Sequence, residues 1–349
     1  SHNTAVGYSA GLSVTTGTQN TLVGGLTGDA LTTGNSNVAV GYQALTADTL
    51  GDRAVAIGLD ALASQNFTTT TDNYNVAVGH SAGRDTTTGI QNTFLGGLAG
   101  YDGASGNNNV IIGYAAGQNN AAAQNTLVGA SSGFALTSGA DNVVVGYEAL
   151  KNEDAHGKNT AIGTQTLFTQ NAGADAYNTA VGFQAGAAVT TGKENTIMGG
   201  LAADALTTGA NVVAVGYKAL SADTKGFGSV AIGNQALENQ NFTTATDSFN
   251  TAVGYFAGND ITTGIEDTLI GALAGDALTT GKENVAVGYR SLSGDTQGKR
   301  SIAIGKDALR FQNFTTATET YNVAVGHAAG EAVTTGQSNT LIGGLAGDA

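Results

Sequence analysis

A short phrase that ends in glycine returns along the whole chain of 349 residues at a nearly constant interval. It reads Asn3-Thr4-Ala5-Val6-Gly7 at its first occurrence, and the closing glycines stand at positions 7, 24, 41, 58, 79, 96, 113, 129, 146, 163, 182, 199, 216, 233, 254, 271, 288, 305, 326 and 343. Fourteen of the nineteen steps between them have the length of the first, from Gly7 to Gly24. Of the other five, one is shorter by one position, one is longer by two and three are longer by four. Twenty copies with a period of about 17 residues predict a solenoid in which each copy forms one coil.

Four coils form a longer unit, which extends from Gly7 to Gly79, and the same distance separates Gly182 from Gly254. The lengthened fourth step carries Gln-Asn-Phe-Thr-Thr, which predicts a protruding loop, whereas the second unit has two extra coils and a shorter loop. Residues 1–2 are interpreted as a cloning scar. The rest is expected to form a single elongated domain over residues 3–349, with super-repeats at about 3–74, 75–177, 178–249, 250–321 and a truncated 322–349.

The residue before each closing glycine is apolar and nearly always β-branched, which is typical of a strand that faces a core. The predicted core residues of this column include Val6, Val23, Val40, Ile57, Ile232 and Ile304. The residue one place earlier is also apolar, most often alanine. Because successive strand residues point to opposite faces, both faces of the strand are apolar. One apolar face can fill the interior of the coil. The other needs a cover that a single thin solenoid does not provide, and this predicts self-association.

Two further columns predict the rest of the coil. A small residue three places after the closing glycine suggests a second short strand, and the glycine of Thr-Thr-Gly, as in Gly17 and Gly34, is expected to take a positive φ at a turn. Asparagine fills fifteen of the twenty coils four places before the closing glycine, and stacked amides could form a hydrogen-bonded ladder. This asparagine ladder includes Asn3, Asn20, Asn37, Asn75, Asn142 and Asn250. The sequence therefore predicts an all-β parallel solenoid, a flattened β-roll with two short strands per coil.

The composition excludes several classes of function. The chain has no cysteine, so thiolate metal sites, disulfides and cysteine nucleophiles are ruled out. Only 11% of its residues are charged, with 13 basic against 27 acidic side chains, and no basic run could bind nucleic acid. No segment approaches the roughly 18 apolar residues of a membrane span, so we expect no direct membrane insertion of this segment.

Neither a metal site nor a catalytic site can be assembled from the pattern. His80 and His327 occupy the slot after the closing glycine, which tyrosine fills in other coils, so we interpret them as packing residues. Asp29, Asp204, Asp276 and Asp348 share one column, but even the nearest of them lie four coils or roughly 19 Å apart, too far to share a calcium ion unless the column faces a three-fold axis. No paired acids converge in one groove, as a polysaccharide hydrolase or lyase would need. We therefore expect no enzyme and no cofactor.

The phrases Ser229-Val230-Ala231-Ile232-Gly233 and Ser301-Ile302-Ala303-Ile304-Gly305, together with the Asn-x-Ala-Val-Gly copies, resemble the head repeats of trimeric autotransporter adhesins. They also resemble repeats in bacteriophage tail fibres. The resemblance covers essentially residues 3–349. It implies a left-handed parallel β-roll that packs as a homotrimer and lies outside the cell, on a cell surface or a virion.

The function that follows as a hypothesis is a non-enzymatic fibre or adhesin segment, which serves as a structural shaft and binds a host or another surface through a glycan or protein receptor. Phe67, Phe242 and Phe314, on the recurrent loops, are the candidate surface contacts. The alternative for these residues is that each phenylalanine plugs the end of its own bulge or a subunit junction. Alternative functions are a phage tail-fibre receptor-binding segment and an ice-binding solenoid, although adjacent Thr-Thr residues would point to opposite faces of a sheet.

Overall fold

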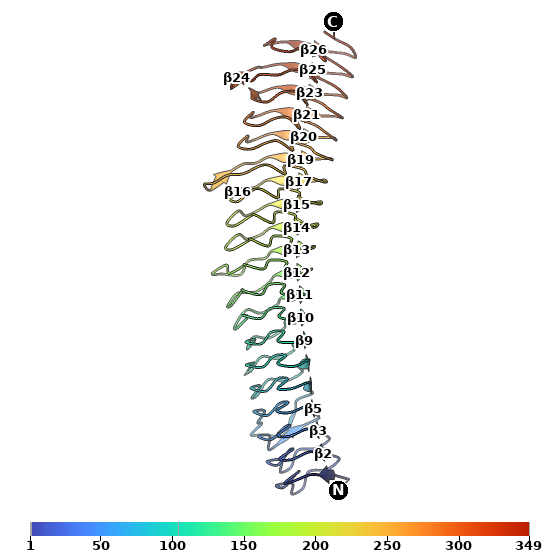
Figure 1. The fold of residues 1–349 in the computed structure, drawn as a ribbon, viewed down its shortest axis with the longest axis vertical. Coiled ribbons are helices and arrows are strands. Elements are labelled where there is room, and N and C mark those ends of the chain that lie inside the picture. Colours follow the sequence, from blue (N-terminus) through green and yellow to red (C-terminus); the bar gives the residue numbers. More distant parts are fainter. Residues whose placement is uncertain (1, 104, 349) are drawn as a thin grey trace. The chain divides into compact units, whose positions relative to one another are not determined.

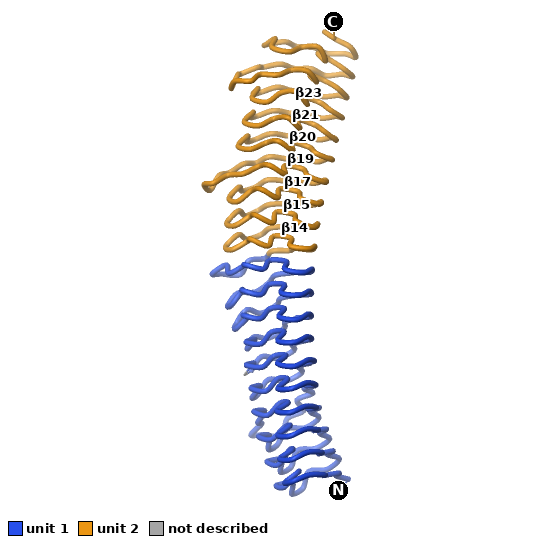
Figure 2. Tube along the Cα trace, viewed as in Figure 1, with its two compact units in different colours: residues 1–177 blue, residues 178–349 orange. Residues whose placement is uncertain are grey.

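The computed structural model of the protein describes residues 2–103 and 105–348, which form a parallel β-solenoid of about twenty coils with the period that the sequence predicts (Figure 1). The predicted all-β solenoid is confirmed to this level. The described residues contain no helix, and hence none that could cross a membrane. The chain divides into two compact units, residues 1–177 and 178–349 (Figure 2). This division falls where the second super-repeat was predicted to end.

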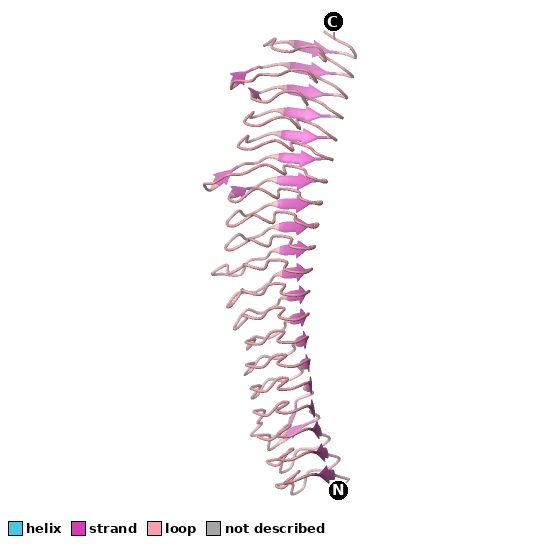
Figure 3. Cartoon of the chain, viewed as in Figure 1, coloured by secondary structure: helices cyan, strands magenta, loops and turns pink. Residues whose placement is uncertain are grey.

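In unit 1, each coil contributes one strand of three residues to a parallel sheet (Figure 3). Neighbouring strands pair in register one coil apart, so that Thr4 lies opposite Thr21 and Thr21 opposite Val38. The strands are β1 (Thr4–Val6), β2 (Thr21–Val23), β3 (Val38–Val40), β5 (Val55–Ile57), β7 (Val76–Val78), β8 (Thr93–Leu95), β9 (Val110–Ile112), β10 (Thr126–Val128), β11 (Val143–Val145) and β12 (Thr160–Ile162). The first lengthened loop adds a second ribbon, in which β4 (Gly51–Asp52) pairs in parallel with β6 (Thr71–Asp72).

Unit 2 repeats this arrangement, and Thr196 of one coil lies opposite Val213 of the next. Its coil strands are β13 (Thr179–Val181), β14 (Thr196–Met198), β15 (Val213–Val215), β17 (Val230–Ile232), β19 (Thr251–Val253), β20 (Thr268–Ile270), β21 (Val285–Val287), β23 (Ile302–Ile304), β25 (Val323–Val325) and β26 (Thr340–Ile342). Two lengthened loops form ribbons, β16 (Gly226–Phe227) with β18 (Thr246–Asp247) and β22 (Gly298–Lys299) with β24 (Thr318–Glu319). Both ribbons project on the side from which the coil strands start (Figure 1).

The interior of each coil is filled by the middle residue of its strand. Leu22, Ala39 and Ala56 are fully or almost fully buried, and so is the same column in unit 2 from Ala180 to Ala324. In the two terminal strands the column is less covered, since Ala5 is exposed and Leu341 is half-buried. The predicted core column, one place later, is wrong, because alternation along a three-residue strand directs that residue outward. Of the predicted core residues, Val23 and Val40 are half-buried, and Val6, Ile57, Ile232 and Ile304 are exposed.

Each regular coil has one strand, and the prediction of a second is wrong. After the closing glycine the backbone alternates into the left-handed region, at φ of 55° in Leu26 and 53° in Gly28. Extended pairing is therefore impossible there, although the coils stay hydrogen-bonded through Leu26 N–H to the Tyr8 carbonyl and Gly28 N–H to the Ala44 carbonyl. A leucine in this region costs roughly 1–2 kcal/mol, so the stacked coils must hold it in place.

The positive φ predicted for the turn glycines Gly17 and Gly34 is wrong, and it is found at the closing glycines instead. The closing glycine Gly24 takes a φ of 141°, whereas the turn glycine Gly34 does not have a positive φ. Gly34 is required instead by close approach, since a Cβ there would lie 2.5 Å from the carbonyl oxygen of Gly51 in the next coil. The closing glycines combine both constraints, because a Cβ on Gly24 would lie 2.5 Å from the oxygen of Gly41.

The predicted asparagine column forms a hydrogen-bonded ladder, but its rungs run between side chain and backbone. Oδ1 of Asn3 accepts from the N–H of Asn20 at 2.9 Å, and Oδ1 of Asn20 accepts from the N–H of Asn37 at 2.9 Å. In most of these coils Nδ2 donates to a turn-glycine carbonyl, as from Asn20 to Gly34 at 2.8 Å, whereas Nδ2 of Asn142 donates to Oδ1 of Asn125 at 3.1 Å. The same two bonds recur at Asn75, Asn178 and Asn195, while Asn142 and Asn250 accept in the same way. The ladder therefore satisfies buried backbone groups that the strand pairing leaves free.

Candidate functional site

The three loop phenylalanines are not the exposed contacts that the sequence suggested. Phe67, Phe242 and Phe314 each have 6% of their surface exposed, so that prediction is wrong. The backbone of each loop turns the ring inward while the residues on either side are exposed. The alternative, in which each phenylalanine plugs its own bulge, is confirmed.

A buried polar network lies beneath each lengthened loop. In the first loop, Nε2 of Gln65 donates to Oδ2 of Asp48 at 2.7 Å, and Nδ2 of Asn75 donates to Oε1 of Gln65 at 2.8 Å. Oδ1 of Asp48 accepts from the N–H of Phe67 at 3.2 Å and from that of Gly51 at 3.1 Å. The equivalent trios are Asp223, Gln240 and Asn250, and Asp295, Gln312 and Asn322. One carboxylate and one amide therefore anchor each loop to the coil.

Burial raises the pKa of Asp48 and of Asp223 above the ordinary range, and the hydrogen bonds from glutamine and from backbone N–H groups oppose that rise. The shorter second loop uses Glu153 in the same place, where Oε2 accepts from the N–H of Ala172 at 3.3 Å. These acids are structural. Sequence reasoning missed them, although an aspartate followed one coil later by a glutamine, in one column and only at the loops, was a visible signal.

The outward face of each unit's sheet is apolar and exposed. The first and third residues of every coil strand point outward, and the third residue is 37% exposed in Ile57, 40% in Leu95 and 41% in Ile270. A column of aromatic residues follows the strands directly after the closing glycine. Its exposed members are Tyr8, Tyr42, Tyr114, Tyr147, Phe183, Tyr217, Tyr255 and Tyr289. His80 and His327 also stand there and are exposed.

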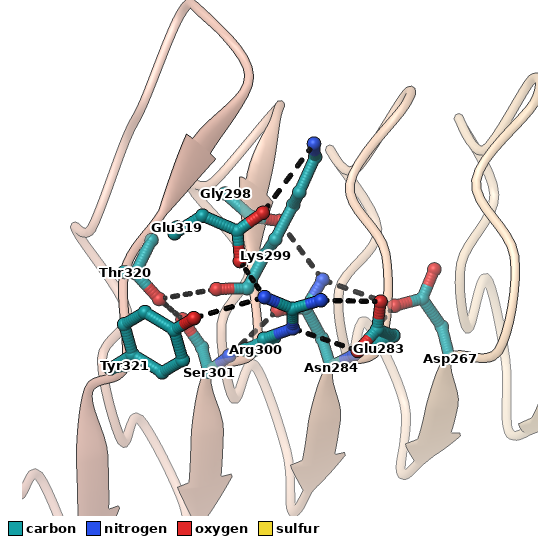
Figure 4. A network of polar contacts seen from close by, with 10 residues as sticks. All are labelled: Asp267, Glu283, Asn284, Gly298, Lys299, Arg300, Ser301, Glu319, Thr320 and Tyr321. Carbon is teal, nitrogen blue, oxygen red and sulfur yellow. Dashed lines mark hydrogen bonds and ion pairs between the residues drawn. The ribbon is translucent and has the colours of Figure 1, made fainter.

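A second exposed feature is a cluster at the corner where the strands of unit 2 begin (Figure 4). Arg300 lies at its centre, with Nε and Nη2 donating to the carboxylate of Glu283 at 2.8 and 3.2 Å. Its Nη1 reaches Oε2 of Glu319 at 2.5 Å and the hydroxyl of Tyr321 at 2.9 Å. The hydrogen bond from Arg300 lowers the pKa of Glu283. The cluster holds Tyr321 in place while half of that side chain stays exposed.

The corner cluster recurs at the other lengthened loops. The Arg53 guanidinium lies 5.5 Å from the ring centroid of Tyr74, and the Lys158 amine lies 5.1 Å from that of Tyr177. At the third loop Gly228 replaces the cation, and the ring of Phe249 packs over it. Tyr74, Tyr177, Phe249 and Tyr321 are all about half exposed. The sequence signal was an aromatic residue directly before the ladder asparagine, found once per super-repeat.

One member of the ladder column is an acid. Asp267 is fully buried, and its Oδ1 accepts from the N–H and Nδ2 of Asn284 at 2.9 and 3.0 Å. Its Oδ2, which stands where an asparagine Nδ2 would donate, has no hydrogen-bond partner among the described residues. Burial, opposed by these hydrogen bonds and reinforced by the charges of Glu266 and Glu283, raises the pKa of Asp267 to about 8. The carboxyl is therefore protonated at neutral pH.

The acidic residues offer little for a metal ion. Within the described part of the chain, one group of three possible ligands comes together, Glu153, Asp154 and His156, with ligand atoms within 4.8 Å of one another. Glu153 already accepts from the backbone N–H of His156 and of Ala172, so its carboxylate serves the loop.

The aspartate column that the sequence singled out is spread over the coils. Asp29 accepts the hydroxyl of Thr46 at 2.6 Å, and Asp204 and Asp276 each have a buried Oδ1 without a hydrogen-bond partner among the described residues. Burial raises the pKa of Asp276 to about 6, with the charge of Asp260 adding to the rise.

The described residues enclose no pocket. The surface features that remain are therefore the outward sheet face and the corner clusters. No protein-family model, no curated protein and no solved structure matches this chain.

Proposed function

We propose that the protein is a non-enzymatic extracellular fibre segment that assembles with further copies of itself through the outward face of its sheet. The observation that carries this proposal is the near absence of charge from that face. The outward strand residues and the residue after each closing glycine make up sixty positions, among which Lys306 is the one charged side chain apart from two histidines. The rest of the chain has 39 charged residues, so the exclusion of charged side chains is specific to this face.

The area available supports a stable interface. Away from the two terminal strands, the outward strand residues range from half-buried to about 40% exposed, and the aromatic residues are about half exposed, so the ten coils of one unit expose on the order of 1,000 Å² of apolar side chain on this face. Monomeric soluble proteins rarely expose more than a few hundred Å² in one patch. A specific interface buries about 800 Å² per partner. Three copies are the arrangement that the resemblance to adhesin heads implies, with location at a cell surface or on a virion.

The corner clusters are the proposed contacts for a receptor. Tyr74, Tyr177, Phe249 and Tyr321 present aromatic rings at the corner where the strands begin, whereas the aromatic column of the assembly face follows the strand ends. Assembly would therefore leave the corner clusters accessible. An exposed ring beside carboxylates and a guanidinium suits a glycan or a polar protein surface.

Light scattering during gel filtration tests the assembly. We expect a mass near three times 34.5 kDa for the wild type at micromolar concentration. Ile270→Glu places a charge on the outward face and is expected to yield monomers, whereas Thr263→Glu adds the same charge at an exposed turn and should leave the mass unchanged. A wild-type monomer of 34.5 kDa would refute the proposal. Circular dichroism confirms that each variant is folded.

An ice-binding solenoid is the second candidate, and one observation favours it. Thr251 and Val253, like Thr268 and Ile270, point outward from the same strand, so the outward face carries two parallel columns rich in threonine and β-branched residues. This threonine column differs from the Thr-Thr turns, whose first hydroxyl bonds along the stack, as from Thr262 to the Thr279 carbonyl. Thermal hysteresis at millimolar protein, with wild-type activity lost in Thr268→Lys, would support ice binding over self-assembly.

A further inference from the structure

We infer that Asn66, Asn241 and Asn313 are acceptor sites for N-linked glycans, which makes the three lengthened loops points of covalent modification. Each asparagine begins an Asn-Phe-Thr triplet, the form Asn-x-Ser/Thr that N-glycosyltransferases recognise. The chain has 30 asparagines, and these are the three that fit the form. The inference does not depend on self-assembly.

The structure presents each triplet in the way that a transferase needs. In the first loop Asn66 is exposed, Phe67 is buried and Thr68 is exposed, and the same alternation holds at the other two triplets. The amide and the hydroxyl that the enzyme must contact are therefore both accessible, while the phenylalanine anchors the loop.

The amide nitrogen of each asparagine is available. Oδ1 of Asn66 accepts the hydroxyl of Thr49 at 3.1 Å, and Asn241 and Asn313 accept from Thr224 and Thr296 at 3.1 and 3.3 Å. Within the described residues, the Nδ2 atoms of these three asparagines make no hydrogen bond. The ladder asparagines Asn20 and Asn75 differ, because they are buried and their Nδ2 atoms donate to glycine carbonyls.

The backbone from the last residue of each triplet onward can move without breaking the solenoid. In the described structure the N–H groups of Thr68, Thr69 and Thr70 donate no hydrogen bond, and the exposed segments 243–245 and 315–317 are alike. Segments with few backbone hydrogen bonds open at low cost in free energy. An enzyme can therefore draw this part of the loop into its active site.

The donor is a sugar activated by a pyrophosphate on its anomeric carbon, attached to either a nucleotide or a lipid. Transfer forms a bond between Nδ2 and the anomeric carbon and breaks the bond from that carbon to the pyrophosphate oxygen. The pyrophosphate leaves with the electron pair, and the proton from Nδ2 passes to a base of the enzyme. No oxidation or reduction is involved.

The shorter second loop is an internal control. Asn171 stands where Asn66 does in the first loop and is also exposed, but the triplet there reads Asn171-Ala172-Gly173. An asparagine on an equivalent loop without the hydroxyl residue should stay unmodified.

The test incubates the folded chain with a soluble N-glycosyltransferase and UDP-glucose in one arm, and with a membrane-bound transferase and a lipid-linked oligosaccharide in the other. Tryptic cleavage separates the acceptor sites into peptides 54–84, 226–282 and 311–349, with the control asparagine in peptide 159–193. We expect sugar on the first three peptides in at least one arm, which also identifies the donor.

The variant Thr68→Ala/Thr243→Ala/Thr315→Ala is expected to lower the occupancy of the three acceptors at least tenfold. The matched variant Thr69→Ala/Thr244→Ala/Thr316→Ala changes exposed neighbours outside the triplets and should leave the occupancy unchanged. Absence of transfer to the folded chain in both arms, transfer to Asn171, or undiminished transfer in the first variant would each overturn the inference. Thermal unfolding of both variants verifies that the loops remain anchored.

Discussion

The substitution Asp267→Asn should stabilise the protein, and the structure sets the size of the effect. Asp267 is the one acid in a column that asparagine fills in fifteen coils, and its buried Oδ2 lacks a hydrogen-bond partner within the described structure. Asparagine has nearly the same shape and would donate its Nδ2 in the place where Asn250 donates to Gly264 at 2.8 Å and Asn284 to Gly298 at 3.0 Å. Asparagine is also uncharged at every pH, so its burial does not require that a carboxyl group stay protonated.

The sign of the pH dependence follows from the raised pKa. In the folded protein the pKa of Asp267 is about 8, against an ordinary value of 3.8 in the unfolded chain. The contribution of this group to stability is therefore complete below about pH 4 and is lost as the pH rises toward 8. At pH 7 the folded carboxyl is still protonated and the unfolded one is ionised. This pH lies about three units above the unfolded pKa, so the stability lost by then is about 4 kcal/mol. Glu266 and Glu283 add to the effect by repelling the ionised form.

Urea unfolding of the wild type and of Asp267→Asn between pH 4 and 8 measures this difference. We expect the two proteins to converge near pH 4 and the variant to gain stability with rising pH, by up to about 4 kcal/mol at pH 7. The converse substitution, Asn250→Asp, should introduce the same pH-dependent loss elsewhere in the column. The reasoning fails if the difference between wild type and Asp267→Asn does not change with pH, or if the variant is less stable at pH 7.

Three further substitutions test the packing of unit 2. Gly199→Ala would place a Cβ 2.4 Å from the Gly216 carbonyl oxygen at a φ of 134°, so we expect it to lower the stability by several kcal/mol in thermal unfolding. In Gly200→Ala the Cβ would meet nothing closer than 3.7 Å, so this matched variant should be nearly neutral. Leu269→Ala empties a fully buried position and should cost about 2–5 kcal/mol in urea unfolding. An equal effect of the two glycine variants, or a loss below about 1 kcal/mol for Leu269→Ala, would contradict the packing described.

The sequence predicted the solenoid, its period and the asparagine ladder because each of these depends on a residue type that repeats in one column. It did not predict which face of the strand lies inside. Both faces are apolar, so alternation alone cannot distinguish them. Side-chain volume could have distinguished them, because the interior of a coil is narrow. It takes small residues such as Ala39 and Ala56, while the larger Val40 and Ile57 stand outside.

The candidate contacts were misplaced for a related reason. Phe67 stands on a loop, and loops are commonly exposed. This loop, however, covers the buried and hydrogen-bonded side chains of Asp48 and Gln65. An apolar side chain must close over these polar groups to keep water away from them, and Phe67 does so. The exposed aromatic residue is Tyr74, seven places later, where the chain rejoins the regular coil. Its partner Arg53 belongs to the previous coil, so the pairing becomes visible only once the coils are stacked.

The period of four coils arises inside the solenoid. Leu269 fills the middle of its strand, and a Cβ on Gly258 of the preceding coil or on Gly275 of its own coil would lie 2.7 Å from that leucine. In the next two coils alanine replaces the strand leucine, and Leu292 and Leu309 fill the interior from the position that glycine held. The two glycines, which lack a Cβ, thus leave room for one large side chain between them. The same exchange occurs around Leu22, Phe94, Leu127 and Leu341.

The interior and the outward face therefore repeat with different periods. The outward face is uncharged in nearly every coil, so it is continuous within each unit, whereas the corner clusters and the Asn-Phe-Thr triplets recur only with the lengthened loops. Adding whole coils, as in the second super-repeat, changes the spacing of the loops without interrupting the face. The proposed self-assembly and the proposed surface display could thus vary independently in such a repeat, because the first depends on every coil and the second on the coils with lengthened loops.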